Sequence, residues 1–232
     1  MNSIKHFSFD LWLTLIKSNP IFKEKRALYF YENYNTKGRN LEFVESVFRR
    51  IDLMCNAINE KTGGNIHSEE MYLMVINEIN NSNNLFDSID LSLIYHQLEG
   101  LFLQHAPTVF DSHTIDTLEI IYQKPDTTIS VLSNTAFIKG KTLRKLLNQL
   151  NMSHFFSFQI YSDEINASKP NPIVFEYLLK EVNIIRKESP LKHSDIIHIG
   201  DNIVADIQGA RSVGINSLLI NSNGKSIQSV YK

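Results

Sequence analysis

The side chains of this sequence that are best suited to chemistry stand shortly after apolar runs, where β-strands would end. Four such places carry them: Asp10 with Thr14, Ser133 with Asn134, Lys169, and Asp201 with Asp206. Carboxylates are ligands for hard divalent cations, and ammonium and hydroxyl groups bind anionic oxygens. These residue types therefore indicate chemistry on an anionic group beside a metal ion.

The four places would meet at one edge of a parallel sheet. Loops and helix N-termini converge at the carboxyl ends of parallel strands, and ligands collect there. Asp10, Asp201 and Asp206 would repel one another at close range, so the cluster requires a cation, and oxygen ligands suit Mg²⁺. Ser133, the amides beside it and Lys169 offer a site for an anionic oxygen group. The joint prediction is a magnesium ion beside a phosphate pocket.

Five short β-type runs alternate with helical stretches and predict this sheet. The predicted strands are 4–9, 128–132, 156–160, 196–199 and 217–220, and the helices between the last four are 137–150, 172–183 and 203–213. A further helix is expected to begin at Asp111 and to end near Tyr122. Strands that alternate with helices favour an α/β fold with a parallel sheet covered on both faces.

Residues 20–106 have a different pattern, because their apolar residues recur at spacings of three and four. This predicts an insert of about four helices, with breaks at 37–40, 61–65 and 80–84 and a helix start at Ser68. Gly63 and Gly64 are expected to form a plain turn, with a hinge or a substrate loop as the other interpretation. The predicted domains are a core of residues 1–16 and 108–232 and a helical cap of residues 17–107.

The composition limits the classes of function. The chain has 232 residues, of which 43% are hydrophobic, and a net charge of −2, so no overall field recruits nucleic acid or a membrane surface. Residues 7–16 are too short for a membrane span, and with Lys17 following they do not fit a signal peptide. Cys55 is the only cysteine and is expected to be a buried, inert thiol. We expect a cytoplasmic protein, and the sequence leaves its oligomeric state open.

The four polar places resemble, in order, the four motifs of the haloacid dehalogenase superfamily. The matching residues are Asp10 with Thr14; Leu132, Ser133 and Asn134; Ser168, Lys169 and Pro170 with Pro172 and Phe175; and Gly200, Asp201 and Asn202 with Asp206, Gly209 and Ala210. The helical insert is similar to the cap that covers the active site in many members. The resemblance spans nearly the whole chain and implies a hydrolase with a Rossmann-like three-layer core and an inserted all-helical cap.

The resemblance also implies the role of each site residue. Asp10 would be the nucleophile and Thr14 an orienting hydroxyl, while Ser133, Asn134 and Lys169 would bind the transferring group. Asp10, Asp201 and the backbone carbonyl of Trp12 would hold Mg²⁺, and Asp206 would support the metal site. A small phosphorylated molecule would be converted through an aspartyl phosphate on Asp10, which divides one hard displacement into two.

Trp12 departs from the phosphatase pattern, because these phosphatases usually carry a second aspartate two residues after the nucleophile. That aspartate protonates the leaving oxygen and then activates water, and Trp12 can do neither. General acid–base catalysis contributes about 10²–10⁴ in rate, roughly 3–5 kcal/mol of barrier. Either the leaving group needs little protonation, or the cap supplies an acid, or the reaction needs none. The Trp12 side chain serves as a substrate platform or as an apolar plug over the nucleophile.

Three alternatives follow from Trp12. Dehalogenation of a 2-haloacid expels halide without a proton, and such enzymes carry an aromatic residue near this position, but they use no metal, whereas Asp201 and Asp206 favour one. Phosphonate cleavage keeps Mg²⁺ and uses a cap lysine, for which Lys17, Lys23 and Lys25 are candidates. A third alternative is a protein that binds a phosphorylated ligand with little turnover.

Further polar residues lie in the predicted cap. Lys23, Lys25 and Arg26 form a basic run that is expected to be a solvated helix face, with contact to a second anionic group of the substrate as the other interpretation. The candidates to replace the missing acid are His67, Glu69, His96 and His105.

Overall fold

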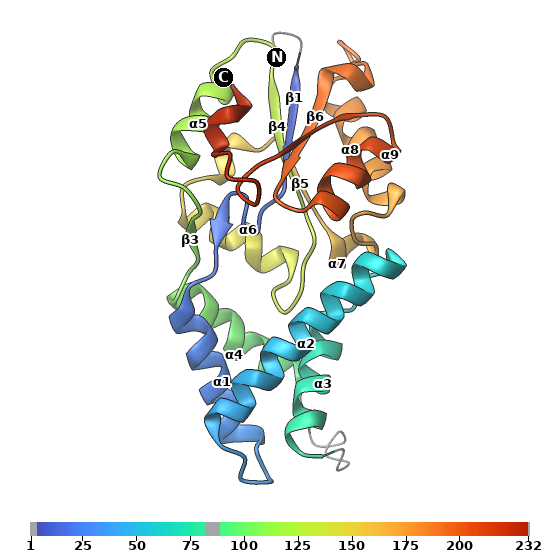
Figure 1. The fold of residues 1–232 in the computed structure, drawn as a ribbon. Coiled ribbons are helices and arrows are strands. Elements are labelled where there is room, and N and C mark those ends of the chain that lie inside the picture. The colour runs from blue at the N-terminus through green and yellow to red at the C-terminus, as the bar shows by residue number, and fades with distance from the viewer. Residues whose placement is uncertain (1–3, 82–88, 232) are drawn as a thin grey trace.

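The computed structural model describes residues 4–81 and 89–231 of the chain. An α/β core, with a sheet between layers of helices, stands above a second lobe made of helices (Figure 1). The predicted α/β fold with its helical insert is confirmed. Across the described residues, no helix combines the length and the apolar character that crossing a membrane requires.

The core sheet has five parallel strands in the order β5-β4-β1-β6-β7. The strands are β1 (His6–Phe9), β4 (Thr128–Ser133), β5 (Phe158–Tyr161), β6 (Ile196–Gly200) and β7 (Asn216–Leu219). All five overlap predicted strands, and β5 begins two residues later than predicted. Because β1 is central and pairs with both β4 and β6, the residues that follow these three strands come together at one edge.

Helices cover both faces of the sheet. The helices of the core are α5 (Thr114–Tyr122), α6 (Gly140–Gln149), α7 (Ser162–Ile165), α8 (Pro172–Ile185) and α9 (Gly209–Ser212), with short helical turns η2 (Ser153–Phe155), η3 (His193–Asp195), η4 (Ile203–Gln208) and η5 (Ile227–Val230). Helices α5 and α6 pack with β1 in one hydrophobic cluster, and α8 and α9 pack in another with β5 and β6. The core is therefore three-layered, as expected.

Two predicted helix starts are wrong. The helix expected from Asp111 begins at Thr114, because the Asp111 carboxylate accepts the amide of His113 in a turn. The helix expected from residue 137 begins at Gly140, and Phe137 instead packs among the cap helices. The helical stretch predicted at 203–213 is present, with a π-helical first part, η4, that continues directly into α9.

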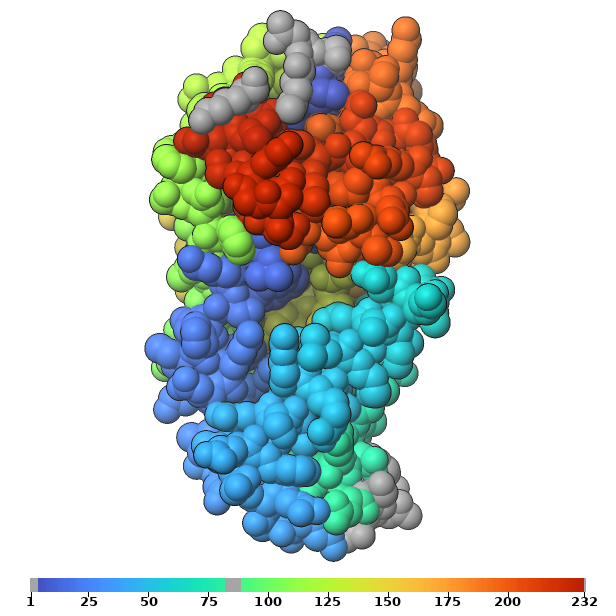
Figure 2. All heavy atoms as spheres, in the orientation of Figure 1, coloured from blue at the N-terminus to red at the C-terminus, as the bar shows by residue number. Residues whose placement is uncertain are grey.

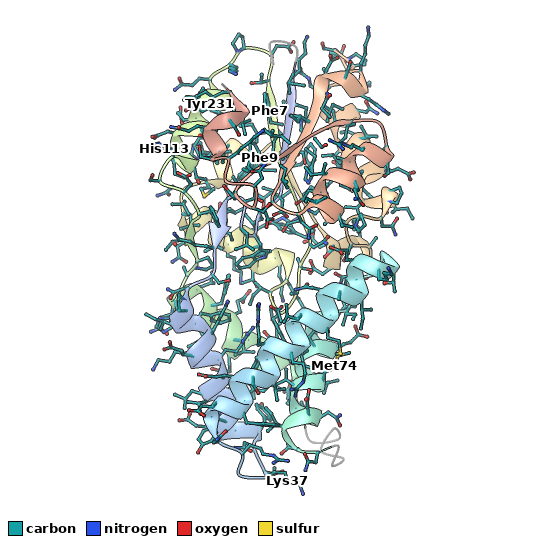
Figure 3. The ribbon with its side chains drawn as sticks, in the orientation of Figure 1. Phe7, Phe9, Lys37, Met74, His113 and Tyr231 are labelled. Carbon is teal, nitrogen blue, oxygen red and sulfur yellow. The ribbon has the colours of Figure 1, made fainter. Side chains whose placement is uncertain are left out.

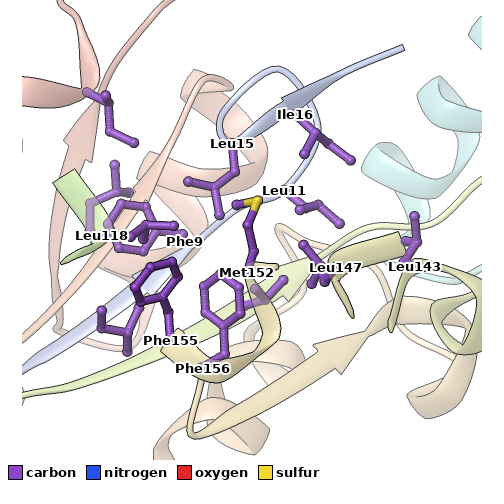
Figure 4. Close-up of a cluster of buried hydrophobic side chains, with 14 of the residues drawn as sticks. Phe9, Leu11, Leu15, Ile16, Leu118, Leu143, Leu147, Met152, Phe155 and Phe156 are labelled. Carbon is purple, nitrogen blue, oxygen red and sulfur yellow. The ribbon is translucent and has the colours of Figure 1, made fainter. Parts of the chain in front are cut away.

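The alternation along β1 separates an apolar face from a polar one. Phe7 and Phe9, labelled in Figure 3, join the cluster beneath α5 and α6. Figure 4 shows Phe9 in this cluster beside residues of α5, α6 and the loop after β1. His6 and Ser8 are fully buried and point to the opposite face, because successive side chains of a strand alternate.

The helical lobe has its own hydrophobic cluster. Its helices are α1 (Pro20–Tyr34), α2 (Leu41–Thr62), α3 (Ser68–Ile79) and α4 (Leu91–Gln104). The side chains of Asn19, Asn40 and Asp90 accept backbone amides at three of the helix starts, and α3 begins at the predicted Ser68. Cys55 lies buried in this cluster, where burial raises the pKa of its thiol to about 11. The predicted turn at 80–84 includes residues 82–84, which lie outside the described residues.

A two-stranded antiparallel sheet lies where the chain passes between the lobes. It joins β2 (Ile16–Lys17) to β3 (Thr108–Val109), with Ile16 opposite Val109. Each strand has only two residues, which is too short for a pattern in the sequence to predict it. The division into core and cap at residues 16–17 and 107–108 remains a prediction, and it runs through this pair.

His6 should make the protein less stable in mild acid. Burial, with the charges of Arg186 and His198, lowers the pKa of His6 to about 3, and both ring nitrogens bond to the Thr128 and Ser130 hydroxyls, at 2.8 and 2.9 Å. The unfolded chain, with a histidine pKa of about 6.5, binds more protons than the folded one between these values, so stability falls as pH drops below about 6.5. From pH 7 to pH 5 this histidine should remove about 2 kcal/mol.

The measurement is urea unfolding at both pH values for the wild type, His6→Gln and His154→Gln. His6→Gln should lose about 2 kcal/mol less than the wild type over this interval, because glutamine does not titrate. His154 is exposed, so its variant should behave like the wild type. Equal losses in all three proteins would contradict the assignment.

Candidate active site

The structure brings the predicted site residues to the carboxyl edge of the sheet. Asp10 follows β1, Ser133 ends β4, Lys169 lies between α7 and α8, and Asp201 and Asp206 follow β6. A cavity of about 460 Å³ lies between this edge and the helical lobe. Its lining includes Asp10, Trp12, Asn134, Lys169, Asp201 and Asp206. In Figure 2 the surface is hollowed between α1 and α2, just below the core.

Lys169 is the centre of the site. Its ammonium donates to Asp10 Oδ1 at 2.8 Å, to Asp206 Oδ1 at 2.7 Å and to the Leu132 carbonyl at 2.8 Å. These three bonds use all its donors. Burial lowers the pKa of Lys169, but the two carboxylates outweigh it and the net shift is upward, so the lysine stays charged.

Asp206 is held from three directions. Besides Lys169, Oδ1 contacts Nε2 of His198 at 3.1 Å, and Oδ2 accepts the amide of Asn202 at 3.0 Å. The other ring nitrogen of His198 contacts the Ser8 hydroxyl at 2.9 Å, so the polar face of β1 supports the site from behind. Burial raises the pKa of Asp206, but Lys169 and His198 outweigh it and hold the pKa below its usual range.

Gly200 makes room for Asp206. A Cβ atom on Gly200 would lie 2.1 Å from Asp206 Oδ2 and 2.2 Å from its Cγ, far inside van der Waals contact. The fourth motif therefore needs glycine at this position for lack of space, and the carboxylate passes directly over its backbone.

Asp10 has both carboxylate oxygens oriented. Lys169 holds Oδ1, and the Thr14 hydroxyl donates to Oδ2 at 3.0 Å. Thr14 Oγ1 is also 3.5 Å from Asp201 Oδ1. Burial, with Asp206 and Asp201, raises the pKa of Asp10 to about 7 against the opposing effect of Lys169, and burial and Asp206 raise that of Asp201 to about 6. The protein alone leaves these carboxylates short of positive charge.

A divalent cation fits this deficit. Asp10, Asp201 and Asp206 each offer an oxygen, and these atoms lie within 4.8 Å of one another. Three carboxylates and the single ammonium of Lys169 leave two negative charges, which one Mg²⁺ would balance, and oxygen donors are the ligands it prefers. The role of the Trp12 backbone carbonyl as a further metal ligand remains a prediction.

Ser133 and Asn134 make contacts that the motif alone did not specify. Asn134 holds the backbone of Lys169, accepting its amide at 2.7 Å and donating to its carbonyl at 3.0 Å. The Ser133 hydroxyl donates to the Asn134 carbonyl at 3.0 Å, and Ser133 is not among the residues that line the cavity. Asn134 thus positions the lysine, and the roles of both residues in binding substrate remain predictions.

The turn after α2 docks on the loop that carries Lys169. The Gly63 carbonyl accepts the amide of Ser168 at 3.1 Å and the side chain of Asn171 at 3.0 Å, and Asn65 accepts the Ser162 hydroxyl at 2.7 Å. Gly63 has a φ of +70°, which favours glycine. The sequence analysis did not predict this contact between the turn and the loop that carries Lys169.

The helical lobe supplies the opposite wall of the cavity. Its lining residues come from α1 (Phe22, Lys23, Arg26), α2 (Arg49, Asp52, Asn56, Glu60) and α4 (Phe102). The α2 residues recur at spacings of three and four, which forms a polar stripe that the sequence analysis missed. Trp12 packs edge-on against Phe102, with ring centroids 6.3 Å apart, so it connects the core to this wall.

The residues considered as replacement acids lie elsewhere. His67, Glu69, His96 and His105 are not among the lining residues, and Glu69 forms an ion pair with Lys139. Asp52 and Glu60 are the acidic side chains that the helical lobe contributes to the described lining. Among the described residues, these two are the candidates for an acid from the cap.

Comparison with known proteins places the chain in a family. The model of the haloacid dehalogenase-like hydrolase family matches residues 8–220, so the chain belongs to this family and is a hydrolase. In fold it is similar to the HAD-hydrolase YfnB from Bacillus subtilis, solved bound to magnesium, with a TM-score of 0.72 and 15% identity over 98% of this chain and 97% of that one.

Two curated relatives differ in their activity. A glyceraldehyde 3-phosphate phosphatase of Methanothermobacter thermautotrophicus is 29% identical over 130 residues, 56% of this chain and 50% of the relative. An (S)-2-haloacid dehalogenase of Pseudomonas sp. is 25% identical over 100 residues, 43% of this chain and 39% of the relative. The matched part thus spans half or less of the curated relatives.

Gly200→Ala should destabilise the protein by displacing Asp206 from Lys169. Overpacking of this kind costs about 1–3 kcal/mol. The free energy of unfolding in urea measures it, with Gly100→Ala in α4 as the control. A Cβ atom at Gly100 meets nothing within 4 Å, and alanine in a helix stabilises by about 0.5–1 kcal/mol relative to glycine. Stabilisation in both variants would show that Asp206 does not need this space.

Proposed function

We propose that the protein is a Mg²⁺-dependent phosphatase that acts on a small phosphorylated metabolite through an aspartyl phosphate on Asp10. The observation that carries the proposal is the charge of the buried cluster. Asp10, Asp201 and Asp206 lie close together, and Lys169, which pairs with Asp10 and Asp206, offsets one of their three negative charges, so a divalent cation would balance the remaining two. The phosphatase relative and the magnesium-bound structural neighbour support the same reading.

The chain's own residues would carry the two steps. One oxygen of Asp10 forms the bond to phosphorus while the bond to the leaving oxygen breaks, and that oxygen takes up a proton. Water then attacks the aspartyl phosphate, which releases inorganic phosphate and restores the carboxylate. Lys169 favours the ionised form of Asp10 against the effect of burial and holds one oxygen in position, and Thr14 donates to the second oxygen. Mg²⁺, held by Asp10, Asp201 and Asp206 and the Trp12 carbonyl, would supply positive charge to the phosphoryl oxygens.

Trp12 limits the choice of leaving group. It packs against Phe102 and lines the cavity, and it has no group that can donate a proton to the leaving oxygen. The proton comes from water or from Asp52 or Glu60 of the helical lobe. A substrate whose leaving group is already a weak base would need this help least.

Dehalogenation is the second candidate, and two observations favour it: the haloacid dehalogenase relative and the aromatic side chain after the nucleophile. The close carboxylates of Asp201 and Asp206 oppose it, because halide displacement by Asp10 needs no cation. Phosphonate cleavage would require a cap lysine in the cavity. Of the candidates Lys17, Lys23 and Lys25, only Lys23 lines it.

Asp10→Asn should abolish phosphate release. The wild type is expected to release phosphate from 4-nitrophenyl phosphate with Mg²⁺ and to lose this activity with a chelator, while Asp10→Asn should fall by at least about 10³-fold, because a neutral amide is no nucleophile here. Release of 4-nitrophenolate measures both. Chloride released from 2-chloropropionate without metal would favour dehalogenation. The absence of both activities would favour a protein that binds a phosphorylated ligand without turnover.

Trp12→Asp should raise activity on alkyl phosphates more than on aryl phosphates. An aspartate here could protonate a poor leaving oxygen, which an aryl phosphate does not require, so we expect a gain of about 10-fold or more in kcat/KM for glycerol 3-phosphate relative to 4-nitrophenyl phosphate. Trp12→Asn is the matched control, since it loses the same packing but transfers no proton. An equal effect of both variants on the two substrates would refute a proton-transfer limit at Trp12.

A further inference from the structure

Arg26 is a charged residue in the interior of the helical lobe. It lies on α1 and is only 8% exposed. Its guanidinium stacks on three aromatic rings, with its Cζ 5.4 Å from the centroid of Phe22, 4.2 Å from that of Phe48 and 4.5 Å from that of Phe137. Cation–π contacts use the faces of a guanidinium, so its N–H groups, which lie in the plane, remain available for hydrogen bonds.

At least one of these N–H groups has no partner among the described residues. Arg26 Nε is buried without a hydrogen-bond partner, and Arg26 forms no ion pair within 4.0 Å with any residue in the described ranges. Asp52 attracts it electrostatically, from beyond ion-pair distance. A buried, unpaired charge is costly, whereas the other buried cation of the site, Lys169, has all three donors occupied.

Arg26 also lines the cavity that Asp10 and Lys169 line from the core side. The helical lobe contributes three basic side chains to this lining, Lys23, Arg26 and Arg49, against the two acidic ones, Asp52 and Glu60. Lys23 and Arg49 are exposed, so Arg26 is the rigid one of the three. A cavity of about 460 Å³ is of the size that holds a small metabolite between its two walls.

We propose that Arg26 binds a second anionic group of the substrate, so that this phosphatase prefers phosphate esters whose leaving group carries a carboxylate or a second phosphate. The inference rests on the proposed function for the reaction and adds the class of substrate. Carboxylate and phosphate share the paired oxygens that a guanidinium edge binds through two parallel hydrogen bonds. The aromatic rings hold this edge in place, which reduces the entropy lost on binding.

The test compares substrates that differ only in the second group. One pair is 3-phosphoglycerate and glycerol 3-phosphate, and the other is propane-1,3-diol bisphosphate and its monophosphate. The wild type should prefer the doubly anionic member of at least one pair by tenfold or more in kcat/KM, and the pair in which this occurs identifies carboxylate or phosphate as the partner. Arg26→Met, which keeps the apolar stem between the rings, should reduce that preference to within about twofold of unity.

Lys25→Met is the control, because Lys25 is an exposed neighbour on the same helix and does not line the cavity. This variant should keep the wild-type preference, and Arg26→Lys should keep part of it. A wild type without preference, or a preference that survives Arg26→Met, would overturn the inference. Since the readout is a ratio within each protein, a general loss of activity does not imitate the expected result.

A binding measurement covers the cases in which Arg26→Met does not fold or the chain has no phosphatase activity. Calorimetry on the wild type with Mg²⁺ should show phosphonoacetate binding at least tenfold more tightly than methylphosphonate, which lacks the second anionic group. Equal affinities would overturn the role of Arg26. Absence of turnover on 4-nitrophenyl phosphate together with tight phosphonoacetate binding would refute the proposed reaction and leave the anion site standing.

Discussion

A lysine ammonium buried at the carboxyl edge of the sheet constrains the rest of this structure. Lys169 is removed from water, so hydrogen-bond acceptors must compensate its charge, and these lie directly after β1, on β4 and in the helical turn after β6. Removing one acceptor would leave an uncompensated charge. Three segments far apart in sequence are thus tied to one atom, and their positions cannot shift independently.

The supports of the lysine extend into both lobes. Asn134 grips its backbone from the core, and the turn at Gly63 bonds to the neighbouring Ser168 and Asn171. The helical lobe also contacts the core at Tyr72, whose hydroxyl donates to the Phe137 carbonyl at 3.0 Å. The loop that carries Lys169 is therefore held partly by the helical lobe. A change in the position of that lobe would displace Lys169.

The sheet and the cluster could be predicted because both follow from local patterns. Apolar runs of four to six residues mark the strands, and polar residues after them must gather where parallel strands end. The contacts within the cluster could not be predicted. Ser133 and Asn134 are adjacent, yet only the side chain of Asn134 binds the backbone of Lys169. The two-residue strands β2 and β3 and the docking of Gly63 depend on tertiary packing, which no spacing in the sequence encodes.

In the basic run of Lys23, Lys25 and Arg26, the helical spacing predicts burial better than the charge of the residues does. A run of charges suggests a solvated face, and this holds for Lys23 and Lys25, which are exposed. Arg26, however, stands four residues from Phe22 and four from Phe30, so it lies on the apolar face of α1, and it is buried. The spacing of Arg26 from Phe22 and Phe30 was therefore sufficient to predict that it lies among apolar residues.

The two walls of the cavity differ in polarity and therefore in how they interact with water. The carboxylates and Lys169 act more strongly where water is excluded, and Trp12 and Phe102 form an apolar boundary beside them. In the proposed reaction, release of phosphate from an aspartyl phosphate nevertheless needs one water molecule at Asp10. Asp52, Asn56 and Glu60 give the opposite wall a polar stripe that can hold water. With a tryptophan in place of a second aspartate, the core positions the nucleophile, and activation of water would depend on the helical lobe.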